Sequence, residues 1–254
     1  MNIVVFDTET ANLEKPFAYN IGYLIFNTDT AEILIKRDFV VEQIWHNKEL
    51  FTTAYYANKR ELYISRMRAR ACRMEKIGYI TQLMARDFKF FDVSSAYAYN
   101  ASFDDRVFTY NCEWFKIQNP FDDIPIYDIR GYVHNKIAFM PEYQKFCDTY
   151  EQYTETRNYS TTAESVYRFI NNAVDFEEEH TALADSEIEL QILRYCIEKG
   201  CEWNKEYKVY NSIRRKAERK LIVNDADGTR WVYPYSKITV YKEKDDITRI
   251  NLRK

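Results

Sequence analysis

The chain has 254 residues, of which 46% are hydrophobic and 17% aromatic, with only five Gly and five Pro. This composition supplies a sizeable core and excludes a disordered or collagen-like chain. No apolar stretch approaches the length of a membrane span, and the first residues do not have the pattern of a signal peptide. Five cysteines without a CxxC spacing favour reduced thiols, so we expect a cytoplasmic protein with no membrane partner.

The formal net charge of −3 is unevenly distributed. Residues 205–254 contain 14 Lys and Arg against 7 Asp and Glu, which predicts a basic C-terminal extension on a first domain spanning residues 1–204. A second basic stretch runs from Lys59 to Lys76. Either stretch is compatible with contacts to a phosphate backbone or with an ordinary solvated face, and the sequence leaves both interpretations open.

The first 90 residues predict three strands followed by helices. Residues 2–6, 19–27 and 32–41 have the apolar, β-branched character of strands, and a turn at 28–31 joins the last two into a hairpin. Helical periodicity then dominates residues 47–90.

The remainder predicts strands that alternate with helices. In chain order we expect a strand at 96–99, a helix at 103–115, a strand at 124–127, a helix capped by Asp128, two helices within 141–172 and a helix at 181–199 ended by Gly200. Residues 221–252 alternate like a β-hairpin with Asp227-Gly228 in its turn. This order predicts an α/β fold with a mixed five-stranded sheet and a small basic β-hairpin appendage.

The first strand ends in two acids, in the sequence Phe6-Asp7-Thr8-Glu9-Thr10. Side chains two apart on a strand point to the same face, so the Asp7 and Glu9 carboxylates repel each other unless a cation lies between them. Carboxylate oxygens suit Mg²⁺ or Mn²⁺. The alternative is a strand end whose acids cap the following loop. The same spacing in Asp185-Ser186-Glu187 lies in a helical pattern, where two side chains diverge by about 200° and do not share one ion.

A second acid follows the strand at 96–99, in Asn100-Ala101-Ser102-Phe103-Asp104. Asn100 suits a turn, Phe103 anchors the next helix, and Asp104 falls in the first turn of that helix, where the helix dipole favours a carboxylate. The alternative is an ordinary first-turn acid.

A third motif precedes the last long helix, in His180-Thr181-Ala182-Leu183-Ala184-Asp185. With Thr181 as N-cap, Asp185 lies near the helix start and His180 lies on the preceding loop, free to reach over an ion that Asp185 holds. Histidine suits a general base because its ordinary pKa is near 6.5. The alternative is a solvated loop histidine.

Together these three motifs resemble the DEDDh 3′–5′ exonucleases, which include the proofreading subunit of bacterial replicative polymerase and its phage-encoded relatives. The family pattern is Asp-x-Glu, then Asn-x-x-Phe-Asp, then His-x-Ala-x-x-Asp, and all three blocks are present here in order within roughly residues 1–200. The resemblance implies a ribonuclease H-like fold with helices on both faces of the sheet.

The resemblance also implies a two-metal mechanism. Asp7, Glu9, Asp104 and Asp185 would hold two Mg²⁺ or Mn²⁺ ions and His180 would deprotonate the attacking water, releasing nucleoside 5′-monophosphates. Thr8, Thr10, Asn100 and Phe103 are candidates for contacts to the terminal nucleotide.

We expect the 3′ end of single-stranded DNA or RNA to be the substrate, with DNA favoured, although no sequence motif reports the contacts to the 2′-hydroxyl that would decide between them. A DNA polymerase is a candidate partner and proofreading a candidate role. The Tyr- and Asn-rich composition would fit a phage. Two alternatives stay open: an RNA-trimming or structure-specific nuclease on the same fold, and a catalytically silent accessory or nucleic-acid-binding module.

Overall fold

The computed structural model describes residues 1–52, 59–214, 220–224, 230–234, 238–243 and 246–252. The chain divides into two compact units, Met1–Ile213 and Arg214–Lys254. The division into a first domain of residues 1–204 and a basic extension of residues 205–254 remains a prediction from the sequence.

The first unit is built on a six-stranded mixed sheet with the strand order β4-β3-β2-β1-β5-β6. The strands are β1 (Asn2–Thr10), β2 (Ala18–Asn27), β3 (Glu32–Val41), β4 (Arg73–Glu75), β5 (Val93–Ala98) and β6 (Ile126–Asp128). The hairpin of β2 and β3 and the β1–β2 pair are antiparallel, whereas β5 lies parallel to both β1 and β6. The mixed α/β class is therefore confirmed.

The strand count was wrong by one. β4 lies within the stretch predicted as helical, and its three residues pair in parallel with the end of β3. The alternation of Arg73, Met74 and Glu75 carries no apolar signal, so this strand owes its existence to the backbone of Phe39–Val41 at the sheet edge.

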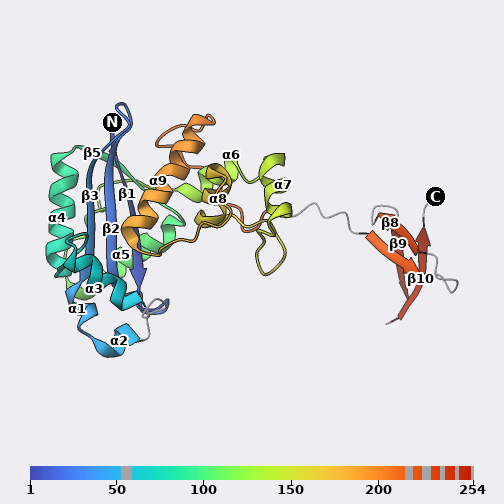
Figure 1. The fold of residues 1–254 in the computed structure, drawn as a ribbon, viewed down its shortest axis with the longest axis horizontal. Helices are drawn as coiled ribbons and strands as arrows, with labels where there is room; N and C mark the ends of the chain where they lie inside the picture. The colour runs from blue at the N-terminus through green and yellow to red at the C-terminus, as the bar shows by residue number, and fades with distance from the viewer. Residues whose placement is uncertain (53–58, 215–219, 225–229, 235–237, 244–245, 253–254) are drawn as a thin grey trace. The chain divides into compact units, whose positions relative to one another are not determined.

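Helices cover both faces of this sheet, and Figure 1 shows α4 and α9 on opposite sides of the strands. The helices are α1 (Glu42–Trp45), α2 (Lys48–Thr52), α3 (Arg60–Arg68), α4 (Ile77–Phe90), α5 (Ala101–Phe115), α6 (Ile129–Lys136), α7 (Pro141–Thr149), α8 (Ala163–Asn171) and α9 (Ala182–Glu198). As predicted, the Asp128 carboxylate caps α6 by accepting from the backbone N–H of Arg130 at 2.9 Å. Gly200, with φ of +91°, follows the end of α9.

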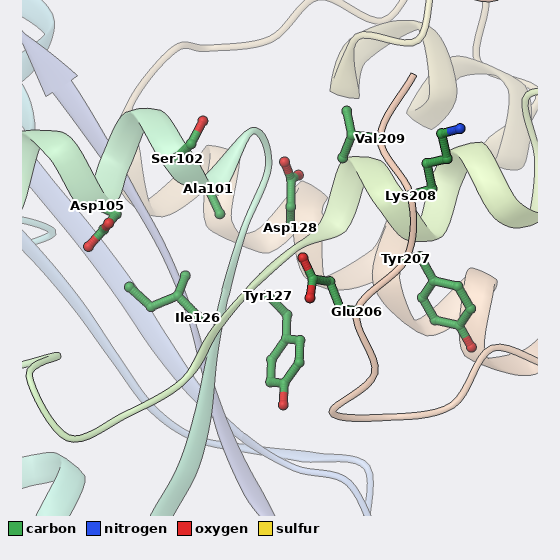
Figure 2. Close-up of a pocket in the computed structure, with 10 residues that line it drawn as sticks. All are labelled: Ala101, Ser102, Asp105, Ile126, Tyr127, Asp128, Glu206, Tyr207, Lys208 and Val209. Atoms are coloured by element: carbon green, nitrogen blue, oxygen red, sulfur yellow. The ribbon is translucent and has the colours of Figure 1, made fainter. Parts of the chain in front are cut away.

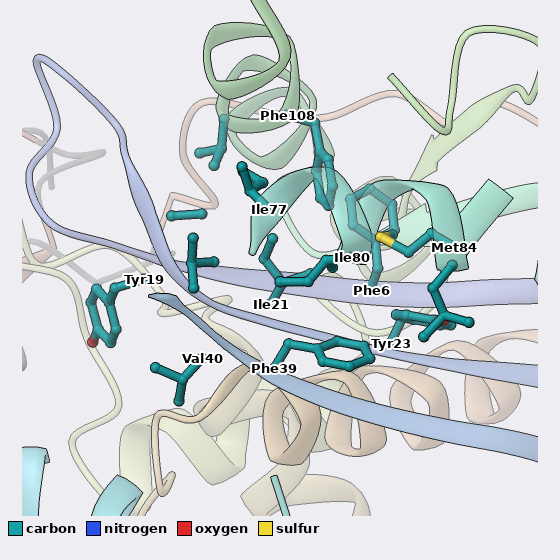
Figure 3. Close-up of a cluster of buried hydrophobic side chains, with 14 of the residues drawn as sticks. Phe6, Tyr19, Ile21, Tyr23, Phe39, Val40, Ile77, Ile80, Met84 and Phe108 are labelled. Atoms are coloured by element: carbon teal, nitrogen blue, oxygen red, sulfur yellow. The ribbon is translucent and has the colours of Figure 1, made fainter. Parts of the chain in front are cut away.

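Alternating side chains of β1 enter two separate cores. Val4 and Phe6 pack on the face covered by α4 and α5, where Figure 3 shows Phe6 among Ile80, Met84 and Phe108. Ile3 and Val5 face the other way and pack with residues of α6 and α9. The alternation directs Asp7 and Glu9 towards the α9 face, because they continue the series that Ile3 and Val5 begin.

Among the described residues no helix is long and apolar enough to cross a membrane. In the second unit, β7 (Lys220–Asn224) pairs with β8 (Arg230–Pro234), and β9 (Ile238–Glu243) pairs with β10 (Asp246–Leu252), each antiparallel. The appendage thus contains two strand pairs where one hairpin was predicted. The predicted Asp227-Gly228 turn lies outside the described residues.

Candidate active site

Two segments far apart in the sequence meet at the C-terminal end of β1. One ligand atom from each of Glu9, His180 and Asp185 lies within 4.8 Å of the others. Glu9 comes from β1, His180 from the loop before α9, and Asp185 from the first turn of α9. The structure therefore brings together the first and third of the predicted motifs.

Gly22 explains why α9 comes so close to the acids of β1. Gly22 pairs with Asp7 across the β1–β2 ladder. A Cβ atom on Gly22 would lie 2.1 Å from the backbone nitrogen of Leu183, a distance no real Cβ tolerates. The missing side chain lets the first turn of α9 sit directly on β2, which places Asp185 beside β1.

The start of α9 is held by Asn20 of β2 and not by Thr181. The Asn20 side-chain oxygen accepts from the backbone N–H of Ala182 at 2.8 Å, and the Asn20 amide donates to Asp38 at 2.6 Å. Thr181 makes no side-chain capping bond, and its buried hydroxyl has no hydrogen-bond partner among the described residues. Thr181 occupies the predicted N-cap position before α9, but the side-chain acceptor comes from Asn20, 162 positions away along the chain.

Asp104 reaches the site from the opposite face of the sheet. It is 2% exposed in the first turn of α5, and the Thr8 hydroxyl donates to its Oδ1 atom at 2.6 Å. Asn100, immediately before α5, has a left-handed backbone with φ of 61°, and the Asp128 carboxylate accepts from its N–H at 3.0 Å. The turn predicted at Asn100 is confirmed, and the neighbouring strand β6 holds it in place.

His180 sits on a constrained loop. Its φ of 52° is in the left-handed region, which is uncommon for a residue with a side chain. Its Nδ1 atom lies 3.7 Å from Glu178 Oε2, and the next residue, Glu179, forms an ion pair with Arg66 at 2.9 Å. Arg66 also contacts Asp38 at 2.9 Å, so this arginine from the basic stretch ties the loop to β3.

The electrostatics of the site strongly favour a cation. Burial raises the pKa of the Asp7 carboxyl well above its usual range, and the charge of Asp104 raises it further. Burial followed by the charge of Asp7 does the same to the pKa values of Glu9 and Asp185. Burial also raises the pKa of Asp104, against the hydrogen bond from Thr8. These raised pKa values mean that the carboxylates ionise together only at a high free-energy cost, unless a cation is bound between them.

The histidine responds in the opposite sense. Burial, followed by the nearby charge of Lys59, lowers the pKa of His180 below its ordinary value, so the imidazole is neutral near pH 7. The pKa of its neighbour Glu178 rises to about 7 through burial and the charge of Glu164. A neutral imidazole beside carboxylates is the form that accepts a proton.

The donor set fits divalent cations. Carboxylate oxygens are the ligands that Mg²⁺ and Mn²⁺ prefer. The Oδ1 atom of Asp185 is buried and lacks a hydrogen-bond partner among the described residues, as expected of an oxygen that coordinates a cation when one is bound.

The four residues predicted to contact substrate fall into two groups. Thr8 and Thr10 are buried, and Thr8 uses its hydroxyl to hold Asp104. Asn100 is exposed and Phe103 is partly exposed, and the Phe103 ring lies 5.4 Å from the guanidinium carbon of Arg106.

One acid at the site has no counterpart in the sequence motifs. Glu189 lies one turn after Asp185 on α9 and is 3% exposed, and the charges of Asp7, Asp104 and Asp185 all act on it. The available signal was its spacing of four from Asp185, which places both on one side of a helix.

A cavity of about 390 Å³ lies beside the candidate site without including it. Figure 2 shows its wall formed by the first turn of α5, the end of β6 and the segment 206–209. Three acids (Asp105, Asp128 and Glu206) and one base (Lys208) line it. An acidic lining disfavours a phosphate backbone, so this cavity is a poor candidate for the nucleic-acid path.

Solved structures of exonucleases share this fold. The nuclease domain of 3′hExo, a DEDDh family member, bound to rAMP, matches with a TM-score of 0.53 at 13% identity, over 84% of this chain and 97% of that one. A 3′-exonuclease described for 3′-end-specific recognition of the histone mRNA stem-loop matches with a TM-score of 0.55 at 13% identity, over 92% and 91%. This chain has the fold of the DEDDh nuclease domains.

The likeness confirms the ribonuclease H-like architecture expected from the motifs. E. coli Exonuclease I in complex with a dA16 oligonucleotide has a TM-score of 0.47 at 16% identity, over 76% of this chain and 42% of that one. No protein-family model matches the sequence, and no curated protein matches it.

Proposed function

We propose that this chain is a metal-dependent 3′–5′ exonuclease that releases nucleoside 5′-monophosphates from the end of single-stranded nucleic acid. The observation that carries the proposal is the meeting of Glu9, His180 and Asp185 within 4.8 Å on the fold of the DEDDh nuclease domains. Acids alone often cluster on protein surfaces. Here they are joined by a neutral histidine from a separately anchored loop.

Asp7, Glu9, Asp104 and Asp185 would hold two Mg²⁺ or Mn²⁺ ions. When bound, such ions lower the pKa of water and neutralise charge on the attacking and leaving oxygens. His180 accepts the proton of the attacking water, whose oxygen forms a bond to the phosphorus of the terminal nucleotide. The bond from that phosphorus to the 3′-oxygen of the preceding nucleotide breaks, and the 3′-oxygen takes up a proton.

Glu178 and Arg66 position the histidine. Glu178 lies 3.7 Å from His180 Nδ1, and Arg66 holds the adjacent Glu179. Since the backbone of His180 is in the left-handed region, these contacts keep it in a conformation that an unsupported loop would leave. We assign Glu178 to orientation of the imidazole rather than to contact with substrate.

One face of α5 has side chains suited to binding a single-stranded substrate. Phe103, Arg106, Tyr110 and Trp114 are spaced three or four residues apart, so they share a face that begins beside Asp104. Trp114 is 61% exposed, and its ring stacks with that of Tyr110 at 6.2 Å. Exposed aromatic rings stack unpaired bases, and an arginine between them neutralises phosphate.

We retain DNA as the first substrate and RNA as the second. The RNA candidate is supported by the neighbours, one of which was solved with rAMP and the other of which recognises a histone mRNA stem-loop. Discrimination would depend on contacts to the 2′-hydroxyl. We also propose that the enzyme proofreads for a DNA polymerase and that it acts in a reducing cytoplasm. The five buried free cysteines are consistent with such a compartment.

The deciding experiment uses purified full-length protein with Mn²⁺ on 5′-labelled single-stranded DNA and RNA of the same sequence. A ladder that shortens from the 3′ end, and that is absent with EDTA or a blocked 3′ end, is the expected result. The faster polymer identifies the preferred substrate. Cleavage of a circular single strand would instead indicate an endonuclease, and intact metal binding without cleavage would favour the silent binding module.

A further inference from the structure

Glu189 is an acid that the three family motifs do not include. It lies in the middle of α9, four residues after Asp185, and its side chain is 3% exposed. Because residues four apart on a helix lie one above the other, Glu189 and Asp185 project from the same side of α9. That side packs against β1 and β2, with Asp7 and Glu9 at the end of β1.

The surroundings of Glu189 are acidic. Burial raises the pKa of Glu189 well above its usual range, and the charges of Asp7, Asp104 and Asp185, three of the four predicted metal ligands, raise it further. The backbone N–H of Tyr99 donates a hydrogen bond to Glu189. The Oε2 atom is buried and has no hydrogen-bond partner among the described residues.

A buried carboxylate oxygen without a partner is costly. Buried charges in proteins are normally paired or bound to a metal, because an unpaired buried charge destabilises the folded protein. A leucine at this position would fill the core between Ile188 and Leu190 without that cost. A cation on the acidic side of α9 removes the cost, because it supplies the missing opposite charge.

We propose that Glu189 contributes a fifth carboxylate to the divalent-cation site of this protein, in addition to those of Asp7, Glu9, Asp104 and Asp185. The inference rests on the metal site of the proposed function. It adds a residue to that site and predicts that the affinity of this chain for divalent cations depends on it.

The test is isothermal titration of the metal-free full-length protein with Mn²⁺. Glu189→Gln keeps the size of the side chain and its acceptor for the Tyr99 N–H but removes the charge. We expect Mn²⁺ affinity to fall by about 10-fold or more, the range found when groups supporting a metal site are removed.

The matched control is Glu187→Gln on the same helix. Glu187 is more exposed and pairs with Lys36 at 2.7 Å, so its loss should leave Mn²⁺ affinity within about 2-fold of the parent, as is typical of a surface ion pair. Unchanged Mn²⁺ affinity in Glu189→Gln, or a parent protein that binds no Mn²⁺, would overturn the inference.

The readout separates this inference from the nuclease proposal. Mn²⁺ binding that depends on Glu189, in a protein that degrades neither DNA nor RNA, supports the inference and removes the proposed function. Active exonuclease with Mn²⁺ affinity independent of Glu189 supports the proposed function and removes the inference.

Discussion

At the scale of single residues, the site depends on residues whose backbone conformation or burial destabilises the folded protein. His180 has a backbone conformation that favours glycine or asparagine, and Asp185 carries a buried oxygen without a partner among the described residues. Neither arrangement stabilises the fold by itself. Several unfavourable features in one place are typical of a functional site. They lower the stability of the folded protein but are retained because the chemistry requires them.

The general-base assignment is tested by replacing His180 with Asn and with Ala. Asparagine tolerates the left-handed backbone but does not accept a proton near pH 7, so it isolates the imidazole from the loop conformation. We expect both variants to lose about 100-fold or more in exonuclease turnover, the usual contribution of a general base. Mn²⁺ binding, followed by calorimetry, should be largely kept. Near-parental turnover in His180→Asn would remove the assignment.

Sequence reasoning found the motif residues because each lies in a recognisable local context. It missed Glu189, which in the sequence is one more acid in a long helix. It also assigned the N-terminal cap of α9 to Thr181, whereas Asn20 supplies the acceptor from another strand. The acceptor at Asn20 exists only after distant segments pack, and no local pattern reports it. For Glu189 the spacing of four from Asp185 was a local signal, but such a spacing is common in helices.

At the scale of secondary-structure elements, the position of α9 on β2 decides whether the site forms. The strands at 19–27 and 32–41 were predicted almost to the residue because their apolar runs are long and bounded by turns. β4 was missed because three polar-flanked residues at a sheet edge have no periodicity of their own. The close approach of α9 to β2 was not predicted from the sequence either, because it depends on the absence of a side chain at Gly22.

Gly22→Ala should therefore separate α9 from β1. Its Cβ atom would meet backbone atoms of α9 at 2.1 Å, so the helix must move and Asp185 with it. We expect a fall in the melting temperature and loss of most exonuclease activity. Gly78→Ala is the matched control, because its nearest neighbour, a side-chain atom of Ile117, lies at 3.6 Å and alanine favours the helix α4. Equal effects of the two substitutions would contradict this account.

The exposed aromatic face of α5 gives a separate prediction about substrate. Trp114→Ala should weaken binding of single-stranded oligonucleotides by about 1–3 kcal/mol if a base stacks on that ring. The control is Phe90→Ala on α4, whose ring is 79% exposed but does not lie on α5. Fluorescence anisotropy with a labelled oligonucleotide compares the two. An unchanged dissociation constant for Trp114→Ala would place the strand elsewhere.

At the scale of the whole molecule, folding and ion binding are coupled. The folded protein raises the pKa values of Asp7, Glu9, Asp104 and Asp185, so between their ordinary and raised values it holds more protons than the unfolded chain. A group of this kind loses its stabilising contribution as pH rises. The metal-free protein should therefore become less stable from about pH 5 towards pH 8.

Differential scanning fluorimetry checks this prediction. In EDTA the melting temperature should fall as pH rises, and Mn²⁺ should restore it by binding the folded form, most strongly at the higher pH. Asp7→Asn should flatten the pH dependence and abolish the response to Mn²⁺, because it removes a carboxylate that Asp104 and Glu9 repel. A melting temperature that rises with pH in EDTA would refute the electrostatic account of the site.

The distance along the chain between β1 and α9 has a consequence for synthesis in the cell. Asp7 and Glu9 leave the ribosome well before His180, Asp185 and Glu189, which emerge only after most of the first unit has been made. A nascent chain consequently lacks the proposed activity until α9 can dock over Gly22.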